Sequence, residues 1–156
     1  MCAFYYGGVF MMKYMEMALE EAKKAYKNGD VPVGAVIVKD NKIISKAYNK
    51  KEKNNVSVYH AEILAIIKAC KKLKTWRLDG CSLYVTLEPC LMCSGAIIHS
   101  RISKVYFATK NEKFGYVSSI DSLLNKKNNH KVEIEEGLCK KQAQRILIDF
   151  FKNKRK

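Results

Sequence analysis

The sequence lacks the features that divide a chain into several parts. It contains no visible linker and no internal repeat, and the nearest approach to low complexity is an enrichment in lysine and asparagine at residues 46–55 and 126–131. A chain of 156 residues without such divisions favours a single domain that is long enough to bury a proper core.

The N-terminus also lacks a secretory or membrane signal. Residues 1–12 are apolar and aromatic, but no basic region precedes them and they are too few to span a bilayer. We therefore expect a cytoplasmic protein that does not enter a membrane, with residues 1–11 as a disordered extension and residues 12–156 as one domain. Met11 or Met12 could be the natural start.

Because no signal delivers the chain to an oxidising compartment, disulfides are not expected among its six cysteines. Two of them belong to a metal motif described below. The other four are expected to be free thiols: Cys2, Cys70, Cys81 and Cys139.

Acidic residues are scarce, with 15 Asp and Glu against 29 Lys and Arg, for a net charge of +14. This excess suits a phosphate-binding surface, although an A/T-rich genome would also load a surface with lysine. The tail is more specific, because Phe150 and Phe151 precede the basic residues 152–156, a combination suited to base stacking and backbone contact. A core-anchored helix with a solvated end is an alternative compatible with that role.

Hydrophobic periodicity predicts an α/β chain in which helices and strands alternate. The expected architecture is a three-layer α/β/α fold around a mixed five-stranded sheet. The predicted elements are a helix at 14–27, strands at 33–38 and 43–48 joined by an Asp40-Asn41 turn, a helix after His60, a strand at 83–87, a helix after Pro89, a strand at 105–108, a short helix near Asp121, a strand at 132–135 and a helix from about Lys140.

Two short motifs contain the residues of a catalytic zinc site. His60 and the pair Cys90 and Cys93 supply three zinc ligands, and Glu62 adds a carboxylate that is not a ligand. A structural zinc normally has four protein ligands, whereas a hydrolytic zinc keeps three and leaves the fourth position to water. The alternative, a structural site completed by Cys81, is disfavoured because an extended chain separates Cys81 from the motif.

The chemistry follows from these residue types. Zinc on one imidazole and two thiolates brings the pKa of its water from roughly 15.7 towards about 7. Glu62 is then the expected proton carrier. Since residues two apart do not share a face of a regular helix, His60 and Glu62 can reach one metal only at a helix start. Pro89 likewise predicts that a helix starts at Cys90, where the helix dipole favours a thiolate.

The stretch 83–102, together with residues 31–38 and 149–151, resembles the bacterial tRNA-specific adenosine deaminases. The resemblance covers nearly all of the chain after about Met12. It implies a cytidine deaminase-like fold, one Zn²⁺ per subunit, a homodimer with RNA crossing the subunit boundary, and conversion of the wobble adenosine of a tRNA anticodon stem-loop to inosine. That adenosine must be splayed out into a pocket before the chemistry can reach it.

The same resemblance implies further site residues. Asn49 lies where the family uses an asparagine to bond the purine, although from the sequence alone an ordinary turn residue is the better interpretation. Glu88 also matches the family and is expected to organise the site rather than to transfer protons.

The chain departs from the family pattern in two places. Residues 56–59 replace the usual Asp-Pro-x-Ala run, and Tyr59 there either stacks on a flanking nucleotide or packs on the surface. Asn111 replaces an acidic residue expected near the ribose, which affects selection of RNA over single-stranded DNA rather than the zinc chemistry.

Two rival functions remain. A free nucleobase or nucleoside deaminase, acting on guanine or cytidine, would need no basic tail. A catalytically silent RNA-binding or scaffold protein is disfavoured by the intact zinc and proton-transfer residues.

Overall fold

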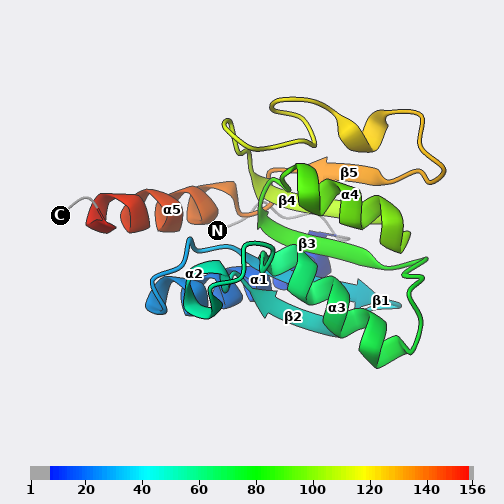
Figure 1. The fold of residues 1–156 in the computed structure, drawn as a ribbon, viewed down its shortest axis with the longest axis horizontal. Coiled ribbons are helices and arrows are strands. Elements are labelled where there is room, and N and C mark those ends of the chain that lie inside the picture. Colours follow the sequence, from blue (N-terminus) through cyan, green and yellow to red (C-terminus); the bar gives the residue numbers. More distant parts are fainter. Residues whose placement is uncertain (1–7, 155–156) are drawn as a thin grey trace.

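The computed structural model describes residues 8–154, and Figure 1 shows its elements in chain order. They are α1 (Gly8–Lys27), β1 (Gly34–Lys39), β2 (Lys42–Tyr48), α2 (Lys51–Asn54), α3 (Ala61–Leu73), β3 (Ser82–Leu87), α4 (Leu91–Ser100), β4 (Lys104–Thr109), the 3-10 helix η1 (Leu123–Asn125), β5 (Glu133–Glu136) and α5 (Lys140–Lys154). None of the helices within this range is both long and apolar enough to cross a membrane.

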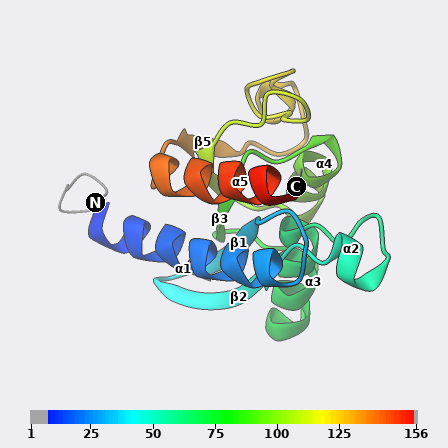
Figure 2. The same cartoon turned by 90° about the vertical axis from the view of Figure 1, so that its left-hand side faces the viewer.

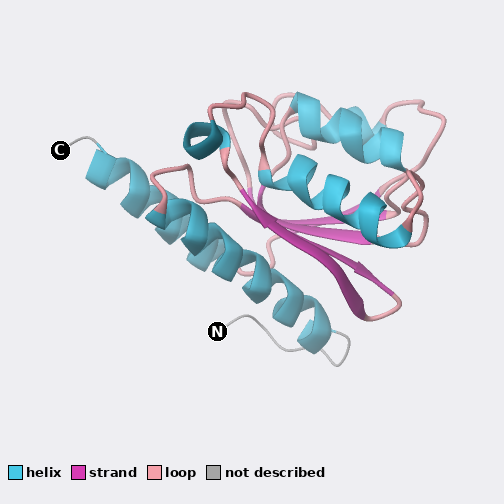
Figure 3. Ribbon diagram, turned by 60° about the horizontal axis from the view of Figure 1, so that its bottom comes forward, coloured by secondary structure: helices cyan, strands magenta, loops and turns pink. Residues whose placement is uncertain are grey.

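The strands form one sheet in the order β2-β1-β3-β4-β5. β1 is antiparallel to both β2 and β3, whereas β3, β4 and β5 run parallel. Helices α3 and α4 cover one face, and α1 and α5 cover the other (Figure 3). The predicted three-layer fold with a mixed five-stranded sheet is confirmed.

Two hydrophobic clusters lie on the two faces of this sheet. Successive side chains of a strand point to opposite faces, so Leu83 belongs to the cluster beneath α3 and α4 while Tyr84 belongs to the cluster beneath α1. Ala61, Ala65 and Ala69 recur every four residues along α3 and are fully buried. Their small side chains let α3 lie close to the sheet.

Glycine is required where α1 crosses the start of β1. A Cβ atom on Gly34 would collide with the backbone carbonyl of Ala18 and lie 2.6 Å from the amide nitrogen of Ala22. Because backbone cannot move aside as a flexible side chain can, any larger residue would push α1 away from the sheet.

The structure differs from the sequence prediction at two helices. α1 begins at Gly8 rather than Tyr14, so residues 8–11 are helical, whereas the part of the predicted extension at 1–7 lies outside the described residues. Helix α2 was not predicted because it contains no apolar residue. Its first amides are instead capped by buried Asp30, whose carboxylate accepts hydrogen bonds from Glu52 N at 2.6 Å and Lys53 N at 3.1 Å.

The loop after α3 carries the single tryptophan of the chain. Trp76 is 59% exposed, and the guanidinium groups of Arg77 and Arg101 lie 5.4 and 5.9 Å from its ring centre.

Candidate active site

Two helix N-termini on one face of the sheet position the metal motif. His60 is the N-cap residue of α3 and Cys90 is the N-cap residue of α4, both with extended backbone. Glu62 and Cys93 follow in the first turns of these helices. The predicted helix starts at His60 and at Cys90 are confirmed.

The three predicted ligand atoms converge. His60 Nδ1 lies 3.6 Å from the Sγ atoms of both Cys90 and Cys93, and the three ligand atoms lie within 4.8 Å of one another. Zinc bonds of about 2.0–2.1 Å to nitrogen and 2.3 Å to sulfur, at tetrahedral angles, separate nitrogen from sulfur by about 3.6 Å. The donor set therefore fits Zn²⁺. Cys81 is not part of this group, because it is buried in the core beneath α3.

The ionisable groups of the cluster affect one another. The hydrogen bond with Cys93 lowers the pKa of Cys90 to about 4, against the effect of burial. The hydrogen bond to Cys90 raises the pKa of His60. Burial raises the pKa of Glu62, whose side chain is almost inaccessible. A thiolate at Cys90 suits cation binding, since metals take the deprotonated form of cysteine.

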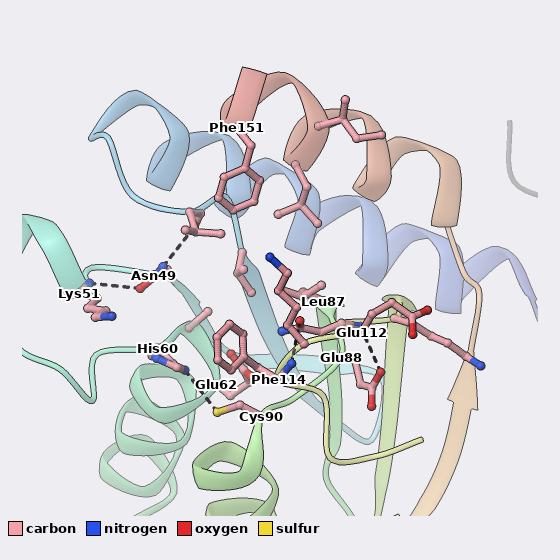
Figure 4. A pocket seen from close by; sticks show the side chains of 18 of the residues that line it. Asn49, Lys51, His60, Glu62, Leu87, Glu88, Cys90, Glu112, Phe114 and Phe151 are labelled. Carbon is pink, nitrogen blue, oxygen red and sulfur yellow. Dashed lines mark hydrogen bonds between the residues drawn. The ribbon is translucent and has the colours of Figure 1, made fainter. Parts of the chain in front are cut away.

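A cavity of about 1110 Å³ opens above this cluster (Figure 4). Its walls come from the segment before β1, the end of β2 through the start of α2, the starts of α3 and α4, the end of β3, the loop after β4 and the last turns of α5. It is lined by Val31, Val33, Asn49, Lys51, His60, Ala61, Glu62, Leu87, Glu88, Cys90, Lys110, Asn111, Glu112, Lys113, Phe114, Leu147, Ile148, Phe151 and Lys152.

Asn49 lies in the wall of this cavity and its side chain is held at both ends. Its Nδ2 donates to the carbonyl of Val31 at 3.2 Å, and its Oδ1 accepts from the amide of Lys51 at 3.1 Å. An amide side chain has two donors and two lone pairs. One donor and one acceptor position of Asn49 therefore remain beyond these two bonds.

Glu88 is a buried acceptor for the loop that follows β4. Its carboxylate accepts hydrogen bonds from the amides of Asn111 and of residues 117–119, at 2.8–3.1 Å, and from the Ser119 hydroxyl. Burial alone would raise the pKa of Glu88, but these hydrogen bonds outweigh it and lower the pKa. A Cβ atom on Gly115 would collide with this carboxylate, so the loop can close over Glu88 only with glycine there.

The predicted RNA contacts separate into two groups. Asn111 and Phe151 line the cavity, whereas Tyr59 is partly buried outside its lining. Phe150 is also away from the lining: it is 6% exposed and packs edge-on against Tyr26 of α1 at 5.5 Å between ring centres. Figure 2 shows α5 lying beside α1. Phe150 thus anchors α5 to α1, which agrees with the alternative of a core-anchored helix given above.

Sequence reasoning missed several lining residues. Phe114 and the lysines at positions 51, 110 and 113 border the cavity, as does Lys152 of the predicted basic tail. In a chain so rich in lysine, no local pattern distinguishes Lys51, Lys110 and Lys113 from the rest. Phe114 gave no signal because its loop takes its shape from Glu88, more than twenty residues earlier.

Comparisons with known proteins place this site in a family. Residues 11–155 match the family described as MafB19-like deaminase. The tRNA-specific adenosine deaminase of Bacillus subtilis (strain 168) is 45% identical over 144 residues, 92% of this chain and 89% of that protein. The protein of the same name from Aquifex aeolicus (strain VF5) is 48% identical over 143 residues, 91% and 94% of the two chains.

Solved structures agree. A structure from a study of A-to-I editing by tRNA:A34 deaminases at the wobble position superposes with a TM-score of 0.84 and 38% identity, over 86% of this chain and 99% of that one. Guanine deaminase from Bacillus subtilis is 41% identical but has a TM-score of 0.60 and covers 63% of each chain. With the fold, the three-ligand cluster and near full-length relatives in agreement, this chain belongs to the tRNA-specific adenosine deaminases.

Proposed function

We propose that the protein hydrolyses the wobble adenosine of a tRNA anticodon stem-loop to inosine and ammonia. The observation that supports this most directly is the convergence of His60, Cys90 and Cys93 beside the buried carboxylate of Glu62, in the wall of a cavity bordered by lysines.

His60, Cys90 and Cys93 are proposed to hold one Zn²⁺ per subunit. When bound there, zinc makes water nucleophilic at neutral pH. Glu62 takes a proton from the attacking water and delivers it to a ring nitrogen of adenine, and then assists departure of the amino group from C6 as ammonia. Its burial keeps bulk water from competing for that proton.

Asn49 is proposed to read the purine with the donor and acceptor that its two backbone bonds leave over. Both bonds fix the amide in one orientation, so little entropy is lost when a base binds. The lysines at the cavity mouth would contact phosphates on either side of the reacting nucleotide.

The cavity has room for more than a free base. Pockets for drug-sized molecules occupy roughly 300–1,000 Å³, and this one, at about 1110 Å³, leaves room beside a single base.

We further propose a cytoplasmic homodimer. The resemblance to the family implies this assembly, and we expect it to bury the exposed apolar side chains of Val58, Ile67 and Leu91, on and near α3 and α4.

The test is an inosine assay on purified, zinc-loaded protein. An anticodon stem-loop with a wobble adenosine is offered beside free adenosine, guanine and cytidine. Inosine in the stem-loop alone is the expected result. Turnover of a free base or nucleoside alone would instead favour a free nucleobase or nucleoside deaminase; guanine deamination is the activity named for the Bacillus subtilis structure that covers 63% of this chain.

A matched variant separates an enzyme from a silent RNA-binding protein. Glu62→Gln keeps the shape of the side chain but removes its basicity, so inosine formation should fall at least about a hundredfold. Zinc content and stem-loop affinity should stay at wild-type values. Full turnover by this variant would show that Glu62 is not the proton carrier.

A further inference from the structure

The loop between β4 and η1 places an aromatic side chain at the mouth of the cavity. Phe114 is 65% exposed and lines the same cavity as the metal cluster. A single exposed apolar residue is ordinary on a protein surface. Phe114, however, faces a second one: Phe151 of α5 is 45% exposed and lines the same cavity. Figure 4 shows the two rings on different walls of the cavity.

Phe114 is held in place by the backbone around it. Its amide donates to Asn111 Oδ1 at 3.2 Å, and the next amide, of Gly115, donates to the Asn111 carbonyl at 2.8 Å. Glu88 fixes the loop on both sides of this turn, and Gly115 lies directly against the Glu88 carboxylate. The ring is therefore carried by a constrained turn, and binding a planar ligand against it costs little additional order.

Positive charge surrounds the two rings. Lys110 and Lys113 belong to the same loop as Phe114, and Lys152 follows Phe151 in α5; all three line the cavity. Aromatic faces among cations are the combination that binds single-stranded nucleic acid, because every base has a face that stacks and every phosphate attracts lysine.

The geometry points to Phe114 as a specificity-determining residue that stacks on a base next to the reacting adenosine, with Phe151 as the facing aromatic wall. This inference rests on the proposed function and extends it to the neighbouring nucleotide. Since stacking depends on the face of a base and not on its hydrogen-bonding edge, the site requires a base at that position and tolerates its identity.

The experiment compares Phe114→Ala and Phe114→Trp on three RNAs: an intact stem-loop and two stem-loops with an abasic nucleotide on the 5′ or the 3′ side of the wobble adenosine. On intact RNA, Phe114→Ala should raise KM about 5- to 100-fold and leave kcat nearly unchanged, as expected for one lost stacking contact. Phe114→Trp should stay near wild type. With one of the abasic RNAs, wild type and Phe114→Ala should become equal.

Ile120→Ala is the matched control, because Ile120 is 49% exposed but does not line the cavity. It should leave KM unchanged. The inference is overturned if Phe114→Ala binds and reacts like wild type, or if its defect persists equally on both abasic RNAs, which would indicate a purely structural role.

A binding series makes failure of this inference distinguishable from failure of the proposed function. The affinities of Glu62→Gln and of Glu62→Gln with Phe114→Ala for the same RNAs are measured by fluorescence anisotropy. Absence of inosine with the wild-type enzyme would refute the proposed reaction, while equal affinities of the two variants for intact RNA would refute stacking by Phe114.

Discussion

At the scale of single residues, two buried glutamates in one cavity wall have opposite surroundings. Glu62 lies beside His60, Cys90 and Cys93, and burial raises its pKa. Glu88 receives hydrogen bonds from amides and a hydroxyl, and its pKa is lowered. Environments that separate the pKa values of two carboxyls indicate different tasks. The first suits proton transfer, whereas the second suits a permanent anion around which a loop is built.

This difference predicts how Glu88→Gln behaves. The substitution leaves four buried or partly buried amides facing a weaker acceptor, so the free energy of unfolding at pH 7 should fall by roughly 1–3 kcal/mol. Because the folded-state pKa of Glu88 lies below its ordinary value of 4.5, the stabilisation is complete above that value and is lost as the pH falls through the folded-state pKa. Wild type and variant should thus converge at strongly acidic pH.

Urea denaturation at pH 7 and across the acidic range measures this effect. Glu20→Gln is the control, since its exposed carboxylate forms a surface ion pair with Lys23, at 2.7 Å. An unfolding free energy of Glu88→Gln equal to wild type at pH 7 would contradict the role of Glu88 as the anchor of the loop.

At the scale of elements, α5 combines two functions that its sequence does not separate. Phe150 packs on Tyr26 of α1, while the next two residues line the cavity. Deleting the whole tail would therefore remove an anchor together with any RNA contact. Single substitutions are needed to distinguish the two.

Lys152→Gln tests the RNA contact alone. If Lys152 contacts a phosphate, the slope of log affinity for the stem-loop against log salt should become shallower by about 0.7, with little change in thermal stability. Lys141→Gln, on an exposed residue in the first turn of α5, is the control. The same slope for Lys152→Gln and wild type would show that this lysine belongs to the general positive charge of the surface.

The elements that could be predicted from the sequence are those with local causes. The strand segments have alternating or continuous apolar residues, and Pro89 marks the start of α4. The predicted positions of the strands and of this helix start therefore lie close to the observed ones. The cluster of His60, Cys90 and Cys93 was predictable because a zinc site requires these residue types at a characteristic spacing along the chain. α2 and the loop carrying Phe114 were not, because each is shaped by a distant buried carboxylate, Asp30 and Glu88 respectively.

At the scale of the whole molecule, the metal would join two helices that the chain separates. His60 caps α3 and Cys90 caps α4, and no covalent link other than the backbone joins them among residues 8–154. A ligand that binds only the folded state stabilises it by RT ln(1 + [L]/Kd), about 4 kcal/mol at a thousandfold excess over Kd. Zinc should therefore affect stability as well as activity.

Chelation of zinc is expected to lower Tm by several degrees and to abolish activity, and added zinc should restore both. Cys90→Ser should lose bound zinc, measured by metal analysis, and should show no further drop in Tm with chelator. Cys70→Ser, at a cysteine outside the cluster, should retain the metal. Full zinc occupancy in Cys90→Ser would overturn its assignment as a ligand.

The position of Trp76 determines what intrinsic fluorescence can report. α3 has 13 residues, so its two ends lie about 20 Å apart, and Trp76 follows the end opposite His60. The fluorescence of this half-exposed indole, which lies near two arginines, should change when the region around α3 unfolds. It should not change when RNA enters the cavity. Phe114→Trp would put a second emitter at the cavity mouth, where quenching by a stacked base would give a direct optical signal of substrate docking.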